Sequence, residues 1–70
     1  IKKNMSSAEV YIVAADREWN AHNFYKDLAA SYPAGEIRDM LLKMANEELK
    51  HKEKAEYLYS NTAFPQTAGG

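Results

Sequence analysis

Two stretches of the chain carry stripes of mostly apolar residues at spacings of three and four positions, which is the period of one face of an α-helix. The first stripe consists of Tyr11, Ala14, Ala15, Glu18, Ala21, Tyr25, Leu28 and Ala29. The second consists of Ile37, Leu41, Met44, Glu48, His51, Ala55 and Leu58. The alternating pattern of a β-strand is not seen, and there is no internal repeat. We therefore predict an all-α protein.

Local signals place the first helix at about residues 7–31. Ser6 and Glu9 have the spacing of a capping box, in which the serine oxygen accepts a hydrogen bond from the backbone N–H of the glutamate. The helix is expected to end before Pro33 and Gly35, because proline and glycine interrupt helical backbone.

The second helix is predicted at about residues 35–59, with Glu36 in the first turn, where the helix dipole favours a negative charge. Residues 60–70 are expected to form an extended tail, with Phe64 docked on the helical bundle. Because a short turn makes consecutive helices antiparallel neighbours, we predict that the whole chain is one domain, an antiparallel helical hairpin.

A hairpin of 70 residues is too small to bury its own apolar stripes. Two helices cover only each other's inner faces, and many large apolar side chains are left over: Tyr11, Trp19, Phe24, Tyr25, Leu41, Leu42 and Met44. We therefore expect a second hairpin to complete a four-helix bundle, most simply as a homodimer with two-fold symmetry. The alternative is that the chain is half of a longer protein that supplies another helix pair.

Composition excludes several classes of function. The chain has no cysteine, so disulfides, zinc–thiolate sites, iron–sulfur clusters and thiol nucleophiles are excluded. Its 9 basic and 10 acidic residues are well mixed and give a net charge of -1, so we expect no nucleic-acid partner. The apolar run at residues 10–15 is too short to span a bilayer, and Lys2 and Lys3 precede polar residues rather than a signal sequence. We expect a cytoplasmic protein without a membrane partner.

The apolar stripes contain ionisable residues that meet at one height of the predicted hairpin. Glu18 lies 15 residues before Pro33 and Glu48 lies 15 residues after it, so an antiparallel hairpin with a tight turn places them level with each other. His51 is one turn further along the face of Glu48. Burying two facing carboxylates is costly unless a positive charge lies between them, and no lysine or arginine lies on the stripes at that height.

A metal cation would supply the missing charge, because two glutamates and a histidine form an oxygen-and-nitrogen ligand set suited to iron, manganese or zinc. A dimer would double the set and create a two-metal site. His22, one turn after Glu18, is a further candidate as a ligand or as a hydrogen-bond partner of a ligand, although a partly buried structural histidine is the favoured interpretation. Glu47 is interpreted as an exposed neighbour of the site rather than a ligand.

Two segments resemble a known family. The first, "REWNAHNFYKDLA", has Glu18 seven residues before the tyrosine of the pair Phe24–Tyr25, and the second, "LLKMANEELKHKEKAEYLY", has Glu48 and His51 in a Glu-Glu-x-x-His sequence. Over some 50 of its 70 residues the chain resembles the rubrerythrin branch of the ferritin-like superfamily. It differs in having one helix pair instead of two and no cysteine-ligated iron domain. The additional carboxylates that tune peroxidase chemistry in rubrerythrin are not identifiable in this sequence.

The resemblance implies a carboxylate-bridged centre of two iron ions in each four-helix bundle, for which manganese or zinc would also suit the ligands. It implies that Glu48 bridges the metals, that Glu18 is a terminal ligand and that His51 is the nitrogen ligand. Tyr25 would be a hydrogen-bond donor that supports the ligands. His22, which the family pattern usually lacks, keeps the alternative role of a ligand or a hydrogen-bond partner given above.

Our leading functional hypothesis is a di-iron oxidoreductase of the peroxidase or ferroxidase type, which reduces peroxide or dioxygen or oxidises ferrous iron. Two metal ions about 3.5–4 Å apart can act jointly on such a substrate. The alternatives are metal binding or storage without catalysis, and a purely structural helical dimerisation module. The native metal, the substrate and the electron donor do not follow from the sequence.

Overall fold

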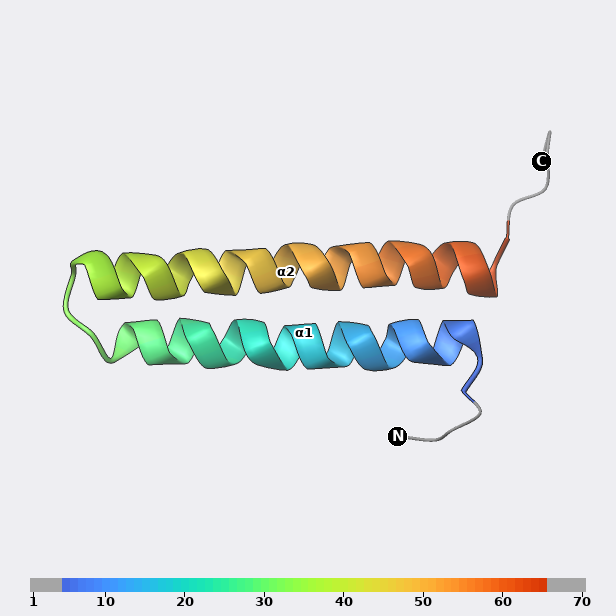
Figure 1. Cartoon of the computed structure of the whole chain (residues 1–70), viewed down its shortest axis with the longest axis horizontal. Helices are drawn as coiled ribbons and strands as arrows, with labels where there is room; N and C mark the ends of the chain where they lie inside the picture. The colour runs from blue at the N-terminus through green and yellow to red at the C-terminus, as the bar shows by residue number, and fades with distance from the viewer. Residues whose placement is uncertain (1–4, 66–70) are drawn as a thin grey trace.

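The computed structural model describes residues 5–65, which fold into two antiparallel α-helices. Helix α1 spans Ser7–Ala30 and helix α2 spans Glu36–Ala63. The helices lie side by side along their length and are joined by a short turn at one end (Figure 1). Strands are absent from the described residues. The predicted all-α helical hairpin is therefore confirmed.

The start of α1 is fixed by the predicted capping residues. The backbone N–H of Glu9 donates to Ser6 Oγ at 3.2 Å, while the Ser6 hydroxyl donates to the Glu9 carboxylate at 3.2 Å. Ser6 itself has extended backbone angles, as an N-cap residue should. At the other end of α1, the Ser31 hydroxyl donates to the carbonyl oxygen of Leu28 at 2.6 Å and so satisfies one of the last free carbonyls.

Helix α2 ends later than the sequence pattern suggested. It continues through Ala63, so the predicted end at about residue 59 and the predicted extended conformation of residues 60–63 are wrong. The physical stop is Pro65, because a proline disfavours helical angles at the residue before it, and Phe64 has non-helical angles of φ -131 and ψ 68. The remainder of the predicted tail, residues 66–70, lies outside the described residues.

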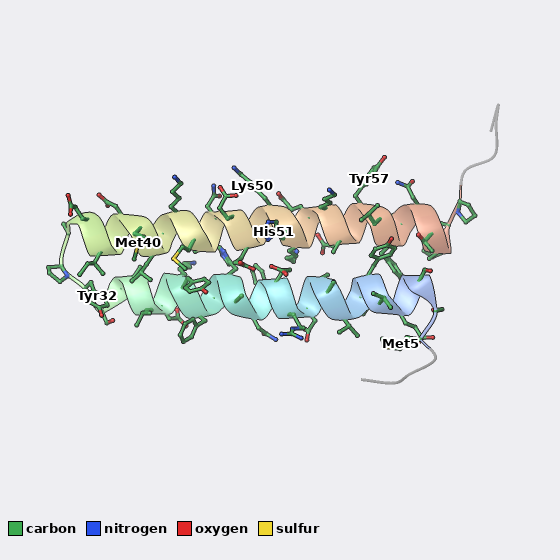
Figure 2. All side chains as sticks on the ribbon, viewed as in Figure 1. Met5, Tyr32, Met40, Lys50, His51 and Tyr57 are labelled. Atoms are coloured by element: carbon green, nitrogen blue, oxygen red, sulfur yellow. The ribbon has the colours of Figure 1, made fainter. Side chains whose placement is uncertain are left out.

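Phe64 is 71% exposed in the single hairpin, and its ring lies edge-on to that of Tyr59 at a centroid distance of 6.3 Å. Its docking on a four-helix bundle stays a prediction. On the outer side of α2, Lys50 and Tyr57 point away from α1 (Figure 2). Both side chains therefore lie outside the contact between the two helices.

The core between the helices is thin and consists mainly of alanine side chains. In the described residues the buried apolar side chains are Ala29, Leu41, Ala45 and Ala55. The Cα trace is only 11 Å deep along its shortest axis, which is a single layer of helices. Within residues 5–65, neither helix has an apolar stretch long enough to cross a membrane.

Candidate metal centre

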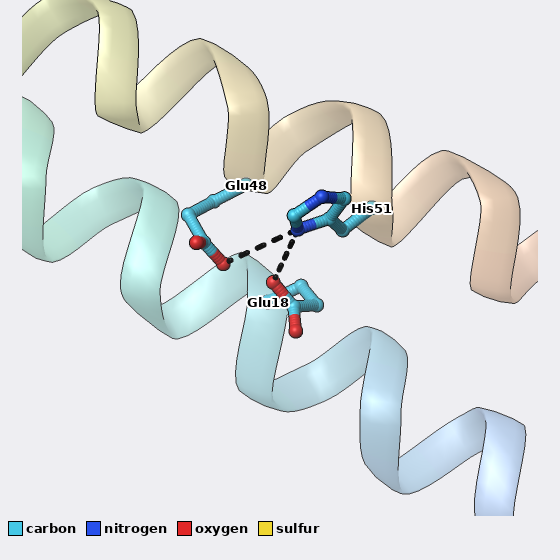
Figure 3. A group of neighbouring side chains, drawn as sticks. All are labelled: Glu18, Glu48 and His51. Carbon is cyan, nitrogen blue, oxygen red and sulfur yellow. Dashed lines mark ion pairs between the residues drawn. The ribbon is translucent and has the colours of Figure 1, made fainter.

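The structure brings the three predicted metal ligands together at the middle of the hairpin. Glu18 extends from α1, and Glu48 and His51 extend from α2 toward it (Figure 3). One ligand atom from each residue lies within 4.8 Å of the other two. The antiparallel pairing of the helices produces this meeting, because residues equally distant from the turn stand at the same height.

The two carboxylates are more enclosed than the imidazole. The side chains of Glu18 and Glu48 are 29% and 25% exposed, whereas that of His51 is 59% exposed. The Nδ1 atom of His51 lies 3.5 Å from Glu18 Oε2 and 4.0 Å from Glu48 Oε2. His51 therefore stands at the edge of the hairpin with one nitrogen directed at both carboxylates. This differs from the buried position expected from the apolar stripe, because none of residues 5–65 covers that side of the hairpin.

One oxygen at the centre of the cluster lacks a partner. Oε2 of Glu18 is buried. It accepts no hydrogen bond when Glu48 is ionised. The hydrogen bond that a protonated Glu48 shares with the Glu18 carboxyl raises the pKa of Glu48 above its ordinary value. Burial of Glu48 and the negative charge of Glu18 raise it further, and the nearby His51 lowers it. The pair thus favours a bound positive charge, whether a proton or a cation.

The donor set and its spacing fit a transition-metal ion. Nitrogen and oxygen ligands bind such an ion at about 2.0–2.2 Å, so two ligands of one ion lie at most about 4.4 Å apart. The two measured distances from His51 Nδ1, 3.5 and 4.0 Å, are within that limit. All three ligand atoms lie within 4.8 Å of one another, which is close to this limit.

Within residues 5–65, no lysine or arginine pairs with the central carboxylates. Lys52, which follows His51 directly, is instead 2.9 Å from the Glu56 carboxylate and lies over the ring of Trp19 at 5.2 Å from its centroid. The described residues therefore supply no lysine or arginine that neutralises Glu18 and Glu48.

The structure places the other candidate residues outside the cluster. Tyr25 packs against Phe24 at a centroid distance of 5.4 Å, and among the described residues no hydrogen bond links it to the ligands. His22 directs Nδ1 at the backbone carbonyl oxygen of Ala45, 2.7 Å away, rather than at a carboxylate. Glu47 is exposed and lies 3.6 Å from Lys50, as expected of a residue that is not a ligand. A supporting role for Tyr25 stays a prediction.

Comparison of the chain with protein-family models, with curated proteins and with solved structures found no match.

Proposed function

We propose that the chain is a metal-binding hairpin of the rubrerythrin-like, ferritin-like type, in which a second copy completes a four-helix bundle around two metal ions, in the first place iron. The observation that carries the proposal is the buried Oε2 of Glu18, which accepts no hydrogen bond and faces Glu48 and His51. A cation is what such an oxygen lacks, and ligands of this type suit iron, manganese and zinc.

Glu18, Glu48 and His51 would hold the metal ions. By the resemblance, Glu48 would be the carboxylate shared by the two ions, Glu18 would bind one of them, and His51 would be the nitrogen ligand. When bound, a pair of iron ions supplies the redox chemistry to reduce peroxide or dioxygen or to oxidise ferrous iron. The carboxylates neutralise positive charge. His51 presents Nδ1 to the carboxylates, which leaves Nε2 free to donate to an acceptor that orients the ring.

One side of α2 has exposed apolar side chains, which supports the proposal that a second copy packs against it. Ile37 and Met44 lie 14 and 7 residues before His51 and therefore share its side of α2. They are 53% and 36% exposed, and the described residues form no pocket of their own. A second hairpin laid against this side would bury both residues and cover the ligands. It would also bring a matching set of ligands, for a total of four carboxylates and two imidazoles.

Measurement of mass and metal content together tests the proposal. After reconstitution with ferrous iron, manganese or zinc, we expect a particle of twice the 7.9 kDa chain mass that holds one metal ion per chain. Glu18→Ala should bind no metal. Glu47→Ala is the matched control, because that carboxylate is exposed and lies beside the ligands, and it should bind metal as the parent does. A monomer without metal, or equal loss in both variants, would contradict the proposal.

Consumption of peroxide or dioxygen by the iron-loaded protein then separates catalysis from storage. Turnover with an electron donor supports the oxidoreductase, while full metal occupancy without turnover under any donor indicates binding or storage alone. The second candidate, a structural dimerisation module, is favoured by the exposed apolar side chains of α2. A stable dimer with only trace metal after reconstitution would support this second candidate.

A further inference from the structure

A second polar contact between the helices lies one turn from the metal ligands. His22, four residues after Glu18 on α1, brings Nδ1 to 2.7 Å from the carbonyl oxygen of Ala45, three residues before Glu48 on α2. Because a carbonyl oxygen only accepts, the proton is on Nδ1. With Glu48 ionised, this is the only hydrogen bond that joins the two helices in the described part of the chain.

Apolar packing alone gives this part of the hairpin little to fix the alignment of the helices. The buried side chains of α2 on either side of Glu48 are Ala45 and Ala55, and the buried side chain of α1 is Ala29. Helices are held in place when ridges of side chains fill grooves of the neighbour, and methyl groups make low ridges. A hydrogen bond with a defined direction can fix the alignment where methyl groups do not.

We propose that His22 is a positioning residue that keeps Glu18 level with Glu48 and thereby sets the affinity of the site for metal. The bond of His22 to Ala45 and the pair of carboxylates are one turn apart on each helix. A slip of α1 along α2 that breaks the bond must therefore also separate the carboxylates. The inference rests on the proposed metal site for its effect on affinity, but not for the alignment itself.

The side chains around His22 hold its ring in place. Trp19 stacks on the imidazole at a centroid distance of 5.3 Å and an interplanar angle of 19°. On the same ring of Trp19 lies the ammonium group of Lys52, 5.2 Å from the centroid. Lys52 is carried by α2, so this stack connects both helices and keeps Nδ1 of His22 aimed at Ala45. The histidine thus has one orientation and one hydrogen bond, as a positioning group requires.

Two variants of the same shape isolate the hydrogen bond. His22→Asn keeps an N–H donor at the position of Nδ1, whereas His22→Leu has the same branching without a donor. We expect zinc affinity, measured by competition with a chelating dye, to fall about tenfold in His22→Leu, which is the lower end of the range for residues that support metal ligands. His22→Asn should bind zinc nearly as tightly as the parent. Equal affinity in all three proteins, or equal loss in both variants, would overturn the proposal.

A metal-free measurement makes the inference independent of the proposed function. The chain has no cysteine, so spin labels can be attached specifically through Asp16→Cys on α1 and Lys54→Cys on α2, both of which are exposed. The distribution of distances between the labels should shift or broaden in His22→Leu. In His22→Asn it should remain as in the parent. If the parent binds no zinc but the distances behave in this way, the proposed function fails and the alignment by His22 stands.

Nitrogen-15 NMR of the metal-free parent provides a test that does not depend on folded variants. The histidine signals should assign the proton of His22 to Nδ1 and show it protected from exchange. A tautomer with the proton on Nε2 alone would overturn the inference, because His22 could then not donate to Ala45.

Discussion

Glu18 and Glu48 put two partly enclosed carboxylates against each other between the helices of a small hairpin. Residues with this arrangement stabilise the fold only when a cation or a proton is present, because like charges repel and enclosed charges lose hydration. His51 lies close enough to both to reduce the repulsion, but its ring is largely exposed. At this scale, a bound cation or proton would relieve the repulsion between the two carboxylates.

In the metal-free protein, Glu48→Gln is expected to raise the melting temperature at neutral pH. The hydrogen bond to the Glu18 carboxyl and partial burial raise the pKa of Glu48 in the folded state. The folded state therefore keeps its proton to higher pH than the unfolded chain, and stability falls as pH rises through this interval. The increase in melting temperature caused by Glu48→Gln should vanish below pH 4.5, the ordinary pKa of glutamate, because Glu48 is then protonated in both the folded and the unfolded state.

Thermal melts followed by circular dichroism in the presence of a chelator, from acid to neutral pH, measure this effect. Glu47→Gln is the control, because its side chain is exposed and lies beside Lys50 rather than another carboxylate. Adding metal should make the parent melt at a higher temperature than Glu48→Gln. Metal binding would stabilise the folded parent, whereas Glu48→Gln would lack one of the proposed ligands. A chelated Glu48→Gln protein that melts below the parent at neutral pH would refute the expectation.

At the scale of elements, the ends of the helices are set by single residues. Ser6 begins α1 through its contact with Glu9, and Pro65 stops α2 through the backbone of Phe64. The turn depends on Gly35, which has φ 157 and precedes α2. Residues with a Cβ atom rarely adopt this angle, so glycine is required here for conformational reasons.

Gly35→Ala is expected to destabilise the hairpin by about 1–3 kcal/mol, the usual cost of a non-glycine residue in a disfavoured backbone region. Crowding is not the cause, because a Cβ atom at Gly35 would have its nearest neighbour, the Pro33 carbonyl oxygen, at 4.0 Å. Chemical denaturation of the synthetic chain measures the change. A D-alanine at this position is the control, because its preferred angles mirror those of L-alanine, and it should leave stability unchanged. Equal destabilisation by both isomers would disprove the conformational explanation.

At the scale of the whole molecule, one layer of two helices leaves large apolar side chains in solvent. Met44 is 36% exposed on the side of α2 that carries His51. Leu42 is 42% exposed but lies nine residues from His51, about two and a half turns, and so faces the opposite side. If a second copy covers the metal ligands, only the side with Met44 should be needed for association.

If the proposed dimer forms, Met44→Lys is expected to convert it from twice the 7.9 kDa chain mass to a single chain in sedimentation measurements. A lysine in the apolar interface would have to lose its hydration without a partner. Leu42→Lys, on the same helix with similar exposure, should leave the mass unchanged. Dissociation by Leu42→Lys with no effect of Met44→Lys would assign the interface to the opposite side.

The candidate site could be predicted to the extent that local spacing controls it. Glu18 and Glu48 are equally distant from Pro33, and any tight antiparallel turn makes such residues level. The contact of His22 with Ala45 could not be predicted, because backbone carbonyls within a helix carry no residue-specific signal. The exposure of His51 was not predicted either. The periodicity of a helical stripe does not distinguish residues that pack within the hairpin from residues that only a second hairpin would cover. The end of α2 at Ala63 could have been predicted, because Pro65 disfavours helical backbone angles at Phe64.

The sequence by itself determined the two helices, their caps and their turn, because capping, backbone restriction and helical periodicity act between residues close in the chain. Only the tertiary structure decided which side chains meet across the helices: the unpartnered oxygen of Glu18, and the bond from His22 to the backbone of α2. These depend on how far one helix is shifted and rotated against the other, and small differences in packing energy between residues distant in sequence set that shift.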